Sequence, residues 1–492
     1  MARVLVIGLD CVPPILAFDA FRTVMPHLDE LMAKGAWGPL RSTVPPITVP
    51  AWTSMVSGRD PGELGLYGFR NRVGGTYDLR IADGRDVAHK RVWDWIGEAG
   101  FRVAPLFVPL TYPPPPVRGQ SIACFLTPDH SDPWAFPAPL RAELTERFGP
   151  YRMDIPDFRG TDPLAVIEGA RHMGEQHFAM AEYVWKEKKP DFMMMVEMGP
   201  DRVHHAAWRS VARTFLGEGG APRDKDRAVA QAVKTYYADL DRQVGHLRSI
   251  AGPDTNVLIV SDHGARTMQG GVRINRWLMD RGWLTLRPSD GDDSSKGNVV
   301  PRRADRPQNG TGTQSSTERR VTPDTIDWAR TRAWGEGGYY GRVFLNVRGR
   351  EPEGIVPPEE VAGLEREIAA GLEDLALPET PSPTRVLFPR RTFRRCQGTA
   401  PDLMVFFGDL AWRSLGTVTT EGGPAGWFSA TNDGGDDGAN HDWNGIFVAE
   451  GPDVTARGKL EGLEIYDVAS TVLGLMGVEP PPDLLGRDRS KG

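Results

Sequence analysis

The sequence predicts an α/β protein with a doubly wound, mainly parallel sheet sandwiched by helices. Three observations lead to this fold class: short apolar runs recur along the chain, helical stretches with one apolar face separate them, and several runs end directly at an Asp or a His. In open α/β sheets, sites are built where parallel strands end, so these Asp and His residues are the first candidates for function.

The composition excludes several classes of protein. The chain has 492 residues, of which 40% are hydrophobic and 25% charged, a globular balance that suffices for one large core or for two to three domains. Its longest apolar runs fall far short of the roughly 20 residues that a membrane-spanning helix needs. The net charge of −7 contains no basic stripe, which argues against a nucleic acid polymer as partner but leaves a small nucleotide substrate open.

The cysteines and the N-terminus bear on the compartment. The three cysteines, Cys11, Cys124 and Cys396, are odd in number and widely spaced, which suits a reducing compartment and provides no metal-binding Cys pair. Met1 is followed closely by the first apolar run, without a long apolar region or a small-residue cleavage site. We therefore expect no secretory signal and a cytoplasmic protein.

The first predicted elements are a strand and a helix. Arg3 to Leu9 is a continuous apolar run that ends in Asp10, which is typical of a central strand buried on both faces with a carboxylate at its end. Cys11 follows, and we expect it to be a small buried residue rather than a nucleophile. Pro26 to Gly35 has apolar residues at helical spacing and a glycine at its end, which predicts a helix.

The stretch from Pro45 to Gly58 contains the candidate nucleophile. Thr48 precedes Pro50, whose fixed φ and missing N–H suit the first turn of a helix, so the Thr48 hydroxyl is predicted near a helix N-terminus with spare N–H donors. Such an end favours an anionic phosphoryl group. From this stretch alone, a plain N-cap role for Thr48 is the stronger interpretation, and the case for a nucleophile comes from the rest of the chain.

The next part of the chain is predicted to cover the site. Trp93 to Gly100 has a short helical pattern, and Arg102 to Val108 is a strand candidate. The four prolines that begin at Pro113, and the stretch rich in Pro and aromatic residues after them, predict a rigid wall rather than a ligand for other proteins. We therefore assign residues 70–160 as a cap insertion.

A long helix and a strand lead to the first pair of candidate metal ligands. Leu164 to Lys189 has apolar residues at helical spacing, and its histidines have no obvious carboxylate partners, so we expect them to be structural. Phe192 to Val196 predicts a strand whose methionines fill the core. Asp201 and His205 follow at a spacing that places both on one helical face, where one ion can bind both. His204 points about a quarter turn away and is the poorer candidate.

The second pair of candidate ligands also follows a helix and a strand. Ala228 to Ile250 predicts the helix, and Asn256 to Val260 predicts the strand, which leads to Asp262, His263 and Gly264. Two adjacent potential ligands at the exit of a buried strand, before a glycine that permits a tight turn, indicate a metal site more specifically than either residue alone. Taken singly, this motif is also compatible with a polar turn.

The C-terminal half begins with a segment that has few core-forming residues. Residues 287–322 are poor in large apolar side chains and predict a disordered insertion. Strands are expected at Val343 to Val347 and at Asp402 to Phe407, with an amphipathic helix from Pro358 to Leu375 between them. We assign residues 323–430 as a second cap insertion.

A loop rich in Asp and Gly leads to the last candidate ligand. Asn432 to Asn440 is tempting as an EF-hand loop, but the bidentate Glu of the twelfth position is missing, so we do not expect a calcium site. His441 follows this loop. The strand Gly445 to Ala449 comes next.

These signals form one set. Six of its members are natural ligands for a borderline divalent ion and the seventh is a hydroxyl: Asp10, Thr48, Asp201, His205, Asp262, His263 and His441. The set resembles the alkaline phosphatase superfamily, and Thr48 to Trp52 is similar to the nucleophile segment of its type I phosphodiesterase/nucleotide pyrophosphatase group. The ligands follow the family's order, and Ile465 to Gly477 resembles its closing helix. The resemblance implies a single alkaline phosphatase-like catalytic domain over residues 1–492.

What the resemblance implies is a two-metal phosphoric ester hydrolase, either a phosphodiesterase or similar to a nucleotide pyrophosphatase. The implied ligands are Asp201, His205 and His441 for one ion, and Asp10, Asp262, His263 and the Thr48 oxygen for the other. Two cations roughly 4 Å apart would activate the hydroxyl and stabilise the leaving oxygen, with a phosphothreonine intermediate that water then releases. Mixed His and carboxylate ligands favour zinc, with manganese as the second choice, over magnesium.

The sequence departs from the family where substrate is contacted. Members that cleave nucleotides often have an Asn where this chain has Ala51, and a His-Gly pair near Leu64 followed by an Asn that contacts the phosphate. Here the latter position falls within Leu66 to Phe69, and Arg70 or Asn71 are the candidates to replace that Asn. We therefore expect a small phosphate ester as substrate, with its identity, the preference for monoester or diester, and the oligomeric state left open.

Two other functional classes remain open. A phosphomutase or phosphotransferase of the same superfamily would use the same metals but return the phosphate to its substrate. A non-catalytic, metal-stabilised binding domain would need no activated hydroxyl. A sulfatase is disfavoured, because no Cys or Ser followed by Pro-x-Arg occurs at the nucleophile segment.

Overall fold

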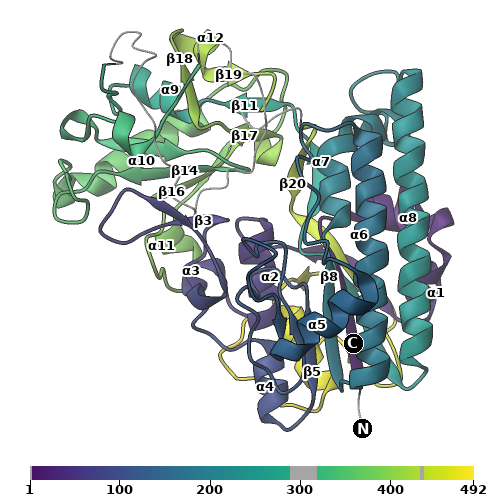
Figure 1. Ribbon diagram of the computed structural model, residues 1–492. Coiled ribbons are helices and arrows are strands. Elements are labelled where there is room, and N and C mark those ends of the chain that lie inside the picture. The colour runs from purple at the N-terminus through teal and green to yellow at the C-terminus, as the bar shows by residue number, and fades with distance from the viewer. Residues whose placement is uncertain (1–2, 289–317, 433–436, 492) are drawn as a thin grey trace.

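The computed structural model describes residues 3–288, 318–432 and 437–491 (Figure 1). Figure 1 shows two lobes, one built on a large sheet with helices on both faces and the other on small sheets and short helices. Most of the predicted disordered insertion, 287–322, lies outside the described residues.

The central sheet has ten strands among the described residues. β1 (Arg3–Leu9) pairs in parallel with β8 (Phe192–Glu197) on one side and with β9 (Thr255–Val260) on the other. β21 (Asn444–Glu450) runs antiparallel to both of its neighbours, but most of the described pairings in this sheet are parallel. The sheet is therefore mainly parallel, and the predicted fold class is confirmed. The strand order is β22 (Gly458–Lys459), β2 (Ala36–Arg41), β21, β9, β1, β8, β5 (Val103–Leu106), β6 (Ser121–Ile122) and β7 (Ala135–Phe136), with β23 (Leu463–Glu464) also paired to β2.

β1 is buried on both faces because its side chains alternate between two hydrophobic clusters. Leu5 and Ile7 belong to one cluster, and Val4 and Val6 to the other. The first cluster is covered by α1 (Pro26–Lys34), α5 (Ala138–Phe148), α6 (Pro163–Tyr183), α7 (Gly199–Val211) and α8 (Asp224–Ala251). The second is covered by α2 (Thr48–Ser57), α4 (Val92–Glu98) and α13 (Asp467–Leu475).

The predicted long helix is α6, which continues as a π-helical turn over Val184–Lys188. Its histidines do have carboxylate partners, so that part of the prediction is wrong. His177 Nδ1 lies 2.8 Å from Glu197 Oε2, and the exposed His172 pairs with Glu168. The partner of His177 comes from β8, and a pairing between such distant segments leaves no local trace in the sequence. The methionines of β8 are buried core residues, as predicted.

The second lobe forms around a hydrophobic cluster of its own, with α9 (Ile274–Asp280) and α10 (Val361–Glu373) beside a four-stranded antiparallel sheet. The order of this sheet is β13 (Ala333–Glu336), β14 (Gly341–Leu345), β16 (Leu403–Phe406) and β15 (Arg385–Leu387). The predicted strands near 343–347 and 402–407 and the predicted helix from 358 to 375 are therefore present. The smaller elements of the lobe are β11 (Gly270–Val272), β12 (Glu318–Arg320), α11 (Pro389–Thr392), β17 (Trp412–Ser414), β18 (Thr417–Thr419), α12 (Gly423–Trp427) and β19 (Phe428–Ser429).

The boundaries of the lobes differ from the predicted insertions. β5, β6 and β7 fall within 70–160 but belong to the central sheet, so this stretch is not a separate cap. The hairpin of β3 (Arg70–Arg72) and β4 (Leu79–Ile81) reaches the second lobe, where Tyr77 stacks on Trp328 with ring centroids 3.5 Å apart. β12 pairs with β18, so the C-terminal end of 287–322 is a strand. Local composition does not reveal such long-range pairings.

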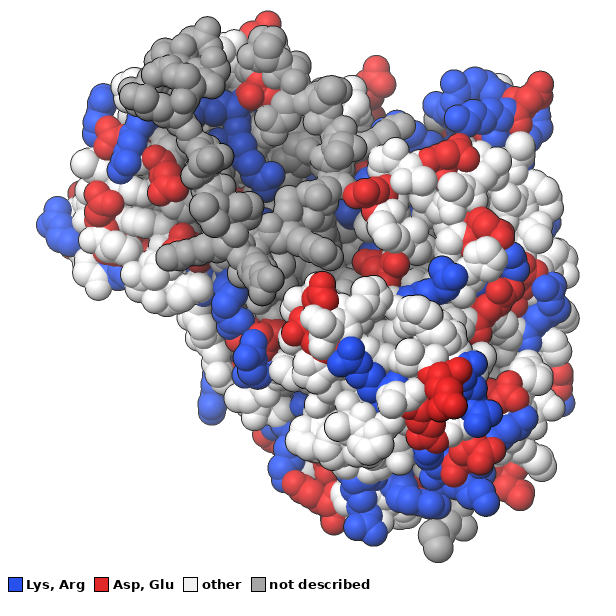
Figure 2. All heavy atoms as spheres, in the orientation of Figure 1, with Lys and Arg blue, Asp and Glu red and all other residues white. Residues whose placement is uncertain are grey.

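The described surface carries charges of both signs. Figure 2 shows Lys and Arg interspersed with Asp and Glu over the described part of one face. Among the helices of residues 3–288, 318–432 and 437–491, none combines the length and the apolar character needed to cross a membrane.

The close packing of β1 against α2 yields a first prediction. A Cβ on Gly8 would lie 2.4 Å from the indole of Trp52, so Gly8→Ala should overpack this contact at a cost of about 1–3 kcal/mol and lower the unfolding temperature. Thermal unfolding followed by circular dichroism measures the effect. Gly363→Ala is the matched control, because Gly363 is exposed and a Cβ there meets nothing within 4 Å. An unchanged unfolding temperature for Gly8→Ala would contradict the described packing.

Candidate metal centre

The fold brings the predicted site residues to one edge of the central sheet. Asp10 follows β1, the pair Asp262 and His263 follows β9, and α7 begins just after β8, so the parallel strands deliver these groups to the same edge. All members of the predicted set are buried: Asp10, Thr48, Asp201, His205, Asp262, His263 and His441.

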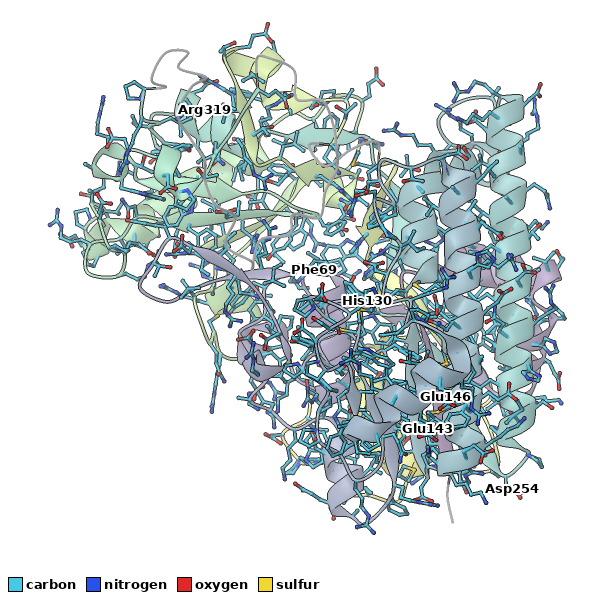
Figure 3. All side chains as sticks on the ribbon, in the orientation of Figure 1. Phe69, His130, Glu143, Glu146, Asp254 and Arg319 are labelled. Carbon is cyan, nitrogen blue, oxygen red and sulfur yellow. The ribbon has the colours of Figure 1, made fainter. Side chains whose placement is uncertain are left out.

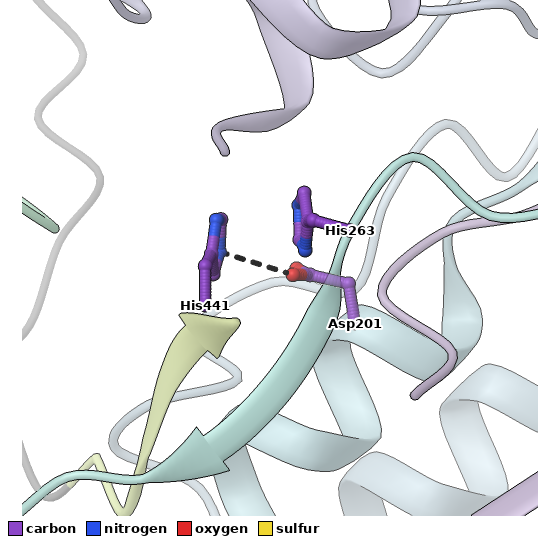
Figure 4. Close-up of side chains that lie close together, drawn as sticks. All are labelled: Asp201, His263 and His441. Carbon is purple, nitrogen blue, oxygen red and sulfur yellow. Dashed lines mark ion pairs between the residues drawn. The ribbon is translucent and has the colours of Figure 1, made fainter. Parts of the chain in front are cut away.

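A short pairing of strands explains how a residue from the far end of the chain reaches this edge. β10 (Gly264–Thr267) pairs antiparallel with β20 (Ala439–Asp442), which places His441 opposite Ala265. The rings of His263 and His441 stack with centroids 3.8 Å apart. Figure 4 shows the carboxylate of Asp201 beside both rings, and its Oδ1 lies 3.6 Å from His441 Nε2.

The first group of possible ligands consists of Asp10, Asp262 and His263. His263 Nε2 lies 3.2 Å from Asp262 Oδ2 and 3.7 Å from Asp10 Oδ1. Two atoms that bind one tetrahedral zinc ion at about 2.0–2.2 Å lie about 3.3–3.6 Å apart, so these separations suit a shared ion.

The second group forms around Asp201. Its Oδ1 lies 3.3 Å from His205 Nε2, one helical turn away on the same face of α7, and 3.6 Å from His441 Nε2. Ligand atoms of Asp201, His441 and His263 all lie within 4.8 Å of one another, so His263 lies close to both groups. The two groups therefore adjoin, as two neighbouring ions would require.

Each carboxylate has one oxygen held by the protein and the other without a partner. The held oxygens are Asp10 Oδ2, which accepts from Trp52 Nε1 at 2.6 Å, Asp201 Oδ2, which accepts from Arg202 at 2.5 Å, and Asp262 Oδ1, which accepts from the Cys11 N–H at 3.2 Å. The opposite oxygens of all three are buried and find no hydrogen-bond partner among the described residues. Buried anionic oxygens without donors are costly, and cations between them remove that cost.

The histidines are oriented in the same way. The Nδ1 contacts are His205 to Asp437 Oδ1 at 3.0 Å, His263 to the Gly264 carbonyl at 3.1 Å, and His441 to the Pro46 carbonyl at 2.9 Å. Carbonyl oxygens and an ionised carboxylate only accept, so Nδ1 carries the proton and Nε2 keeps its lone pair for the site. His441 Nε2 has no hydrogen-bond partner in the described part of the chain. The donor set thus fits divalent ions.

The pKa shifts of these side chains, considered without any ion, also agree with a site for divalent ions. Burial raises the pKa of Asp10 and of Asp262 well above the ordinary range, and the negative charges of neighbouring carboxylates add to the effect. Burial acts the same way on Asp201, but His205 and Arg202 hold its pKa well below the ordinary value. Burial also lowers the pKa of His263 to about 4, which keeps this candidate ligand neutral near pH 7. The carboxyls therefore resist joint ionisation unless cations are present.

Thr48 lies beside this centre at the start of α2. Its Oγ1 is 3.2 Å from His263 Nε2. The N-cap residue of the helix is Ile47 and no side chain caps this end, so the interpretation of Thr48 as a plain N-cap is wrong. The amides of Thr48 and Val49 belong to the first helical turn and have no intrahelical acceptor. The hydroxyl thus lies between the candidate ligands and the positive end of a helix.

Two residues near the site, His204 and Cys11, lie as the sequence predicts. His204 faces away from the centre, and its Nε2 lies 2.9 Å from the Tyr237 hydroxyl. Burial lowers the pKa of His204 to about 3. Cys11 is buried, as predicted.

Asn71, a candidate for the missing phosphate contact, is occupied within its own turn. Its Oδ1 accepts from the Tyr67 N–H at 2.7 Å, and its Nδ2 donates to the Gly68 carbonyl at 3.1 Å. The amide of Asn71 thus stabilises this turn.

Sequence reasoning missed a polar network next to His205. Asp437, from the loop that was considered as an EF-hand, accepts from Arg159 Nε at 2.8 Å and lies 3.0 Å from Arg413 Nη2. Burial by itself raises the pKa of Asp437, but Arg413 and His205 hold it well below its ordinary value. Tyr339 from the second lobe completes the network, with its hydroxyl 3.2 Å from His205 Nε2. These residues come from four distant segments, so no local motif marks them.

The fold and this set of carboxylates and histidines define a member of the alkaline phosphatase superfamily. Within it, the profile of the family "Type I phosphodiesterase / nucleotide pyrophosphatase" matches residues 4–443. The chain therefore belongs to the type I phosphodiesterase/nucleotide pyrophosphatase family, whose members are phosphoester hydrolases.

Solved structures share the fold at low sequence identity. Murine ectonucleotide pyrophosphatase/phosphodiesterase 5, as an inactive threonine-to-alanine variant in complex with AMP, is 12% identical, with a TM-score of 0.56 over 98% of this chain and 96% of that chain. Phosphonoacetate hydrolase from Sinorhizobium meliloti 1021, in complex with phosphonoformate, is 14% identical, with a TM-score of 0.55 over 96% of each chain. No curated protein sequence matches this chain.

Because Asp262 Oδ2 has no hydrogen-bond partner among the described residues, we predict that replacing Asp262 changes the metal content. Zinc-reconstituted protein should contain close to two ions per chain, and Asp262→Ala should lose at least one of them, because the substitution removes the oxygen that faces the site. Elemental analysis by mass spectrometry gives the count. Asp254→Ala is the control, since Asp254 is exposed at the opposite end of β9 (Figure 3). An unchanged count for Asp262→Ala would refute the assignment.

The contact between Asp437 and His205 predicts a change in metal affinity. Asp437→Asn removes the charge that holds the proton on His205 Nδ1, so zinc affinity should fall by about 10- to 100-fold. Competition with a chelator of known affinity measures this change, and thermal unfolding of the metal-free variant separates it from a loss of stability. Wild-type affinity in Asp437→Asn would show that Asp437 does not orient His205.

Proposed function

We propose that this protein is a two-metal phosphoric ester hydrolase, acting on a small phosphate ester as a phosphodiesterase or nucleotide pyrophosphatase does. The observation that carries the proposal is the convergence of unpartnered carboxylate oxygens and His Nε2 atoms beside the hydroxyl of Thr48. The expected ligands are Asp201, His205 and His441 for one ion, and Asp10, Asp262, His263 and the Thr48 oxygen for the other.

The reaction is a phosphoryl transfer to Thr48. Bound zinc, or manganese as the second choice, would supply charge that favours the ionised hydroxyl and stabilises the leaving oxygen. Thr48 Oγ1 forms a bond to phosphorus while the bond from phosphorus to the leaving oxygen breaks, which gives a phosphothreonine. Water then attacks that phosphorus, the bond from phosphorus to Thr48 Oγ1 breaks, and the phosphate product leaves while a proton from the water restores the threonine hydroxyl. Throughout, the amides at the start of α2 stabilise negative charge on the phosphoryl oxygens.

The comparisons support this assignment at different levels. Membership of the family supports phosphoester hydrolysis. The murine relative is described as inactive when a threonine is replaced by alanine, which is consistent with a threonine nucleophile here. That relative binds AMP and the bacterial one binds phosphonoformate, so both hold small phosphorus-containing anions. We expect a substrate of the same size class for this chain.

For the compartment, we retain the cytoplasm as part of the proposal. Cys11, Cys124 and Cys396 are all free thiols in this structure, with two of them buried. Unpaired cysteines are typical of proteins in a reducing environment.

The role of Thr48 is tested by substitution. Thr48→Ala should keep its metals, because six side-chain ligands survive, yet lose turnover by roughly 10³-fold or more on any accepted ester. Thr48→Ser should keep a sizeable part of it, since only a methyl group is removed. Turnover of p-nitrophenyl phosphate and bis-p-nitrophenyl phosphate by zinc-loaded protein measures both.

A matched control separates Thr48 from its neighbours. Thr53→Val should turn over like the wild type, because the Thr53 hydroxyl donates to the Val49 carbonyl at 2.7 Å within the same helix. Acid quenching followed by peptide mass spectrometry should find phosphate on Thr48 in the wild type and not in Thr48→Ala. Wild-type turnover in Thr48→Ala would rule out a phosphothreonine intermediate at this position.

A further inference from the structure

Tyr339 reaches the candidate metal centre from the second lobe. It lies in the turn between β13 and β14, and its ring stacks on His441 with centroids 3.8 Å apart. The guanidinium of Arg413 lies 4.4 Å from the ring centroid, and Asn440 Nδ2 donates to the Tyr339 carbonyl at 3.2 Å. The residue is partly exposed to solvent, and these contacts fix its ring in position.

The hydrogen bonds of the Tyr339 hydroxyl show where its proton points. Arg159 Nη2 donates to this oxygen at 2.7 Å, and a guanidinium cannot accept a hydrogen bond in return. The phenolic proton is therefore free for another acceptor, and His205 Nε2 lies 3.2 Å away. Because His205 Nδ1 carries its proton toward Asp437, Nε2 is the acceptor of this pair.

Metal binding would remove that acceptor. If the lone pair of His205 Nε2 binds an ion, the Tyr339 proton has to find another oxygen close to the same ion. Ligand atoms on one tetrahedral ion are about 3.3–3.6 Å apart, and the Tyr339 hydroxyl lies 3.2 Å from His205 Nε2, so a phosphoryl oxygen on that ion and the hydroxyl would both be neighbours of the same nitrogen. Arg159 keeps the tyrosine in place, because its Nε is held by Asp437.

We infer that Tyr339 is a further catalytic residue, whose hydroxyl donates to a non-bridging oxygen of the phosphoryl group bound next to His205 and His441. The inference rests on the proposed function for the position of that phosphoryl group. In this chain, the hydrogen-bond donor to the phosphoryl group would therefore come from the second lobe. The amide of Asn71 is not available for this role, because it is engaged in its own turn. Phe69, which lies where the lobes meet (Figure 3), has its ring centroid 6.5 Å from that of Tyr339, so this donor faces the junction of the lobes.

The test removes the hydroxyl and keeps the ring. Tyr339→Phe should lower kcat/KM by about 10- to 100-fold, as expected for the loss of a hydrogen bond to a charged group. The dissociation constant of inorganic phosphate for the zinc-loaded protein, measured by isothermal titration calorimetry, should rise by about tenfold. Zinc content should stay unchanged, because Tyr339 is not assigned as a ligand. Tyr340→Phe is the matched control, since that hydroxyl donates to the Tyr67 carbonyl at 2.6 Å.

The outcomes separate this inference from the proposed function. Wild-type kcat/KM and phosphate affinity in Tyr339→Phe would overturn the inference, as would a loss of zinc or an equal loss in Tyr340→Phe. If the wild type hydrolyses no phosphate ester, the proposed function fails. In that case phosphate titration alone decides whether Tyr339 binds the anion.

Discussion

The candidate site depends on one arrangement that is repeated in the three carboxylates and the three imidazoles: a hydrogen bond holds one polar atom, and the other atom faces the centre. Trp52, Arg202 and the Cys11 amide hold the three carboxylates, while two carbonyls and Asp437 hold the three imidazoles. A buried polar group without a partner costs about 1–3 kcal/mol, more when charged. Cations that join several such atoms remove this cost, which is why we interpret the cluster as a metal centre.

The same contacts connect this centre to the core of the protein. Trp52 packs against Gly8 of β1 and also donates to Asp10, so one side chain both fills the second hydrophobic cluster and fixes a candidate ligand. Asp437 connects His205 to Arg159 and Arg413, and Tyr339 brings the second lobe into the network. Changes in packing between the lobes should therefore alter the positions of the candidate ligands, because these charged groups are buried and have few alternative partners.

Much of the fold and several residues of the candidate site could be predicted from local sequence patterns. Asp10, Asp262 and His263 were identifiable because each follows a buried apolar strand, and Asp201 and His205 because they share a helical face. The partner of His177, the strands inside 70–160 and the roles of Asp437 and Tyr339 could not be predicted, since each depends on pairing between distant segments. The interpretation of Thr48 as an N-cap, which the local stretch alone favours, is off by one residue: the helix begins at Thr48, and Ile47 is the N-cap.

The most direct test is a crystal structure of zinc-loaded protein with anomalous data at the zinc edge. The account predicts two peaks roughly 4 Å apart. One should lie next to Asp10 Oδ1, Asp262 Oδ2 and His263 Nε2, and the other next to Asp201 Oδ1, His205 Nε2 and His441 Nε2. A single peak, or zinc bound to the oxygens that Trp52 and Arg202 hold here, would contradict it.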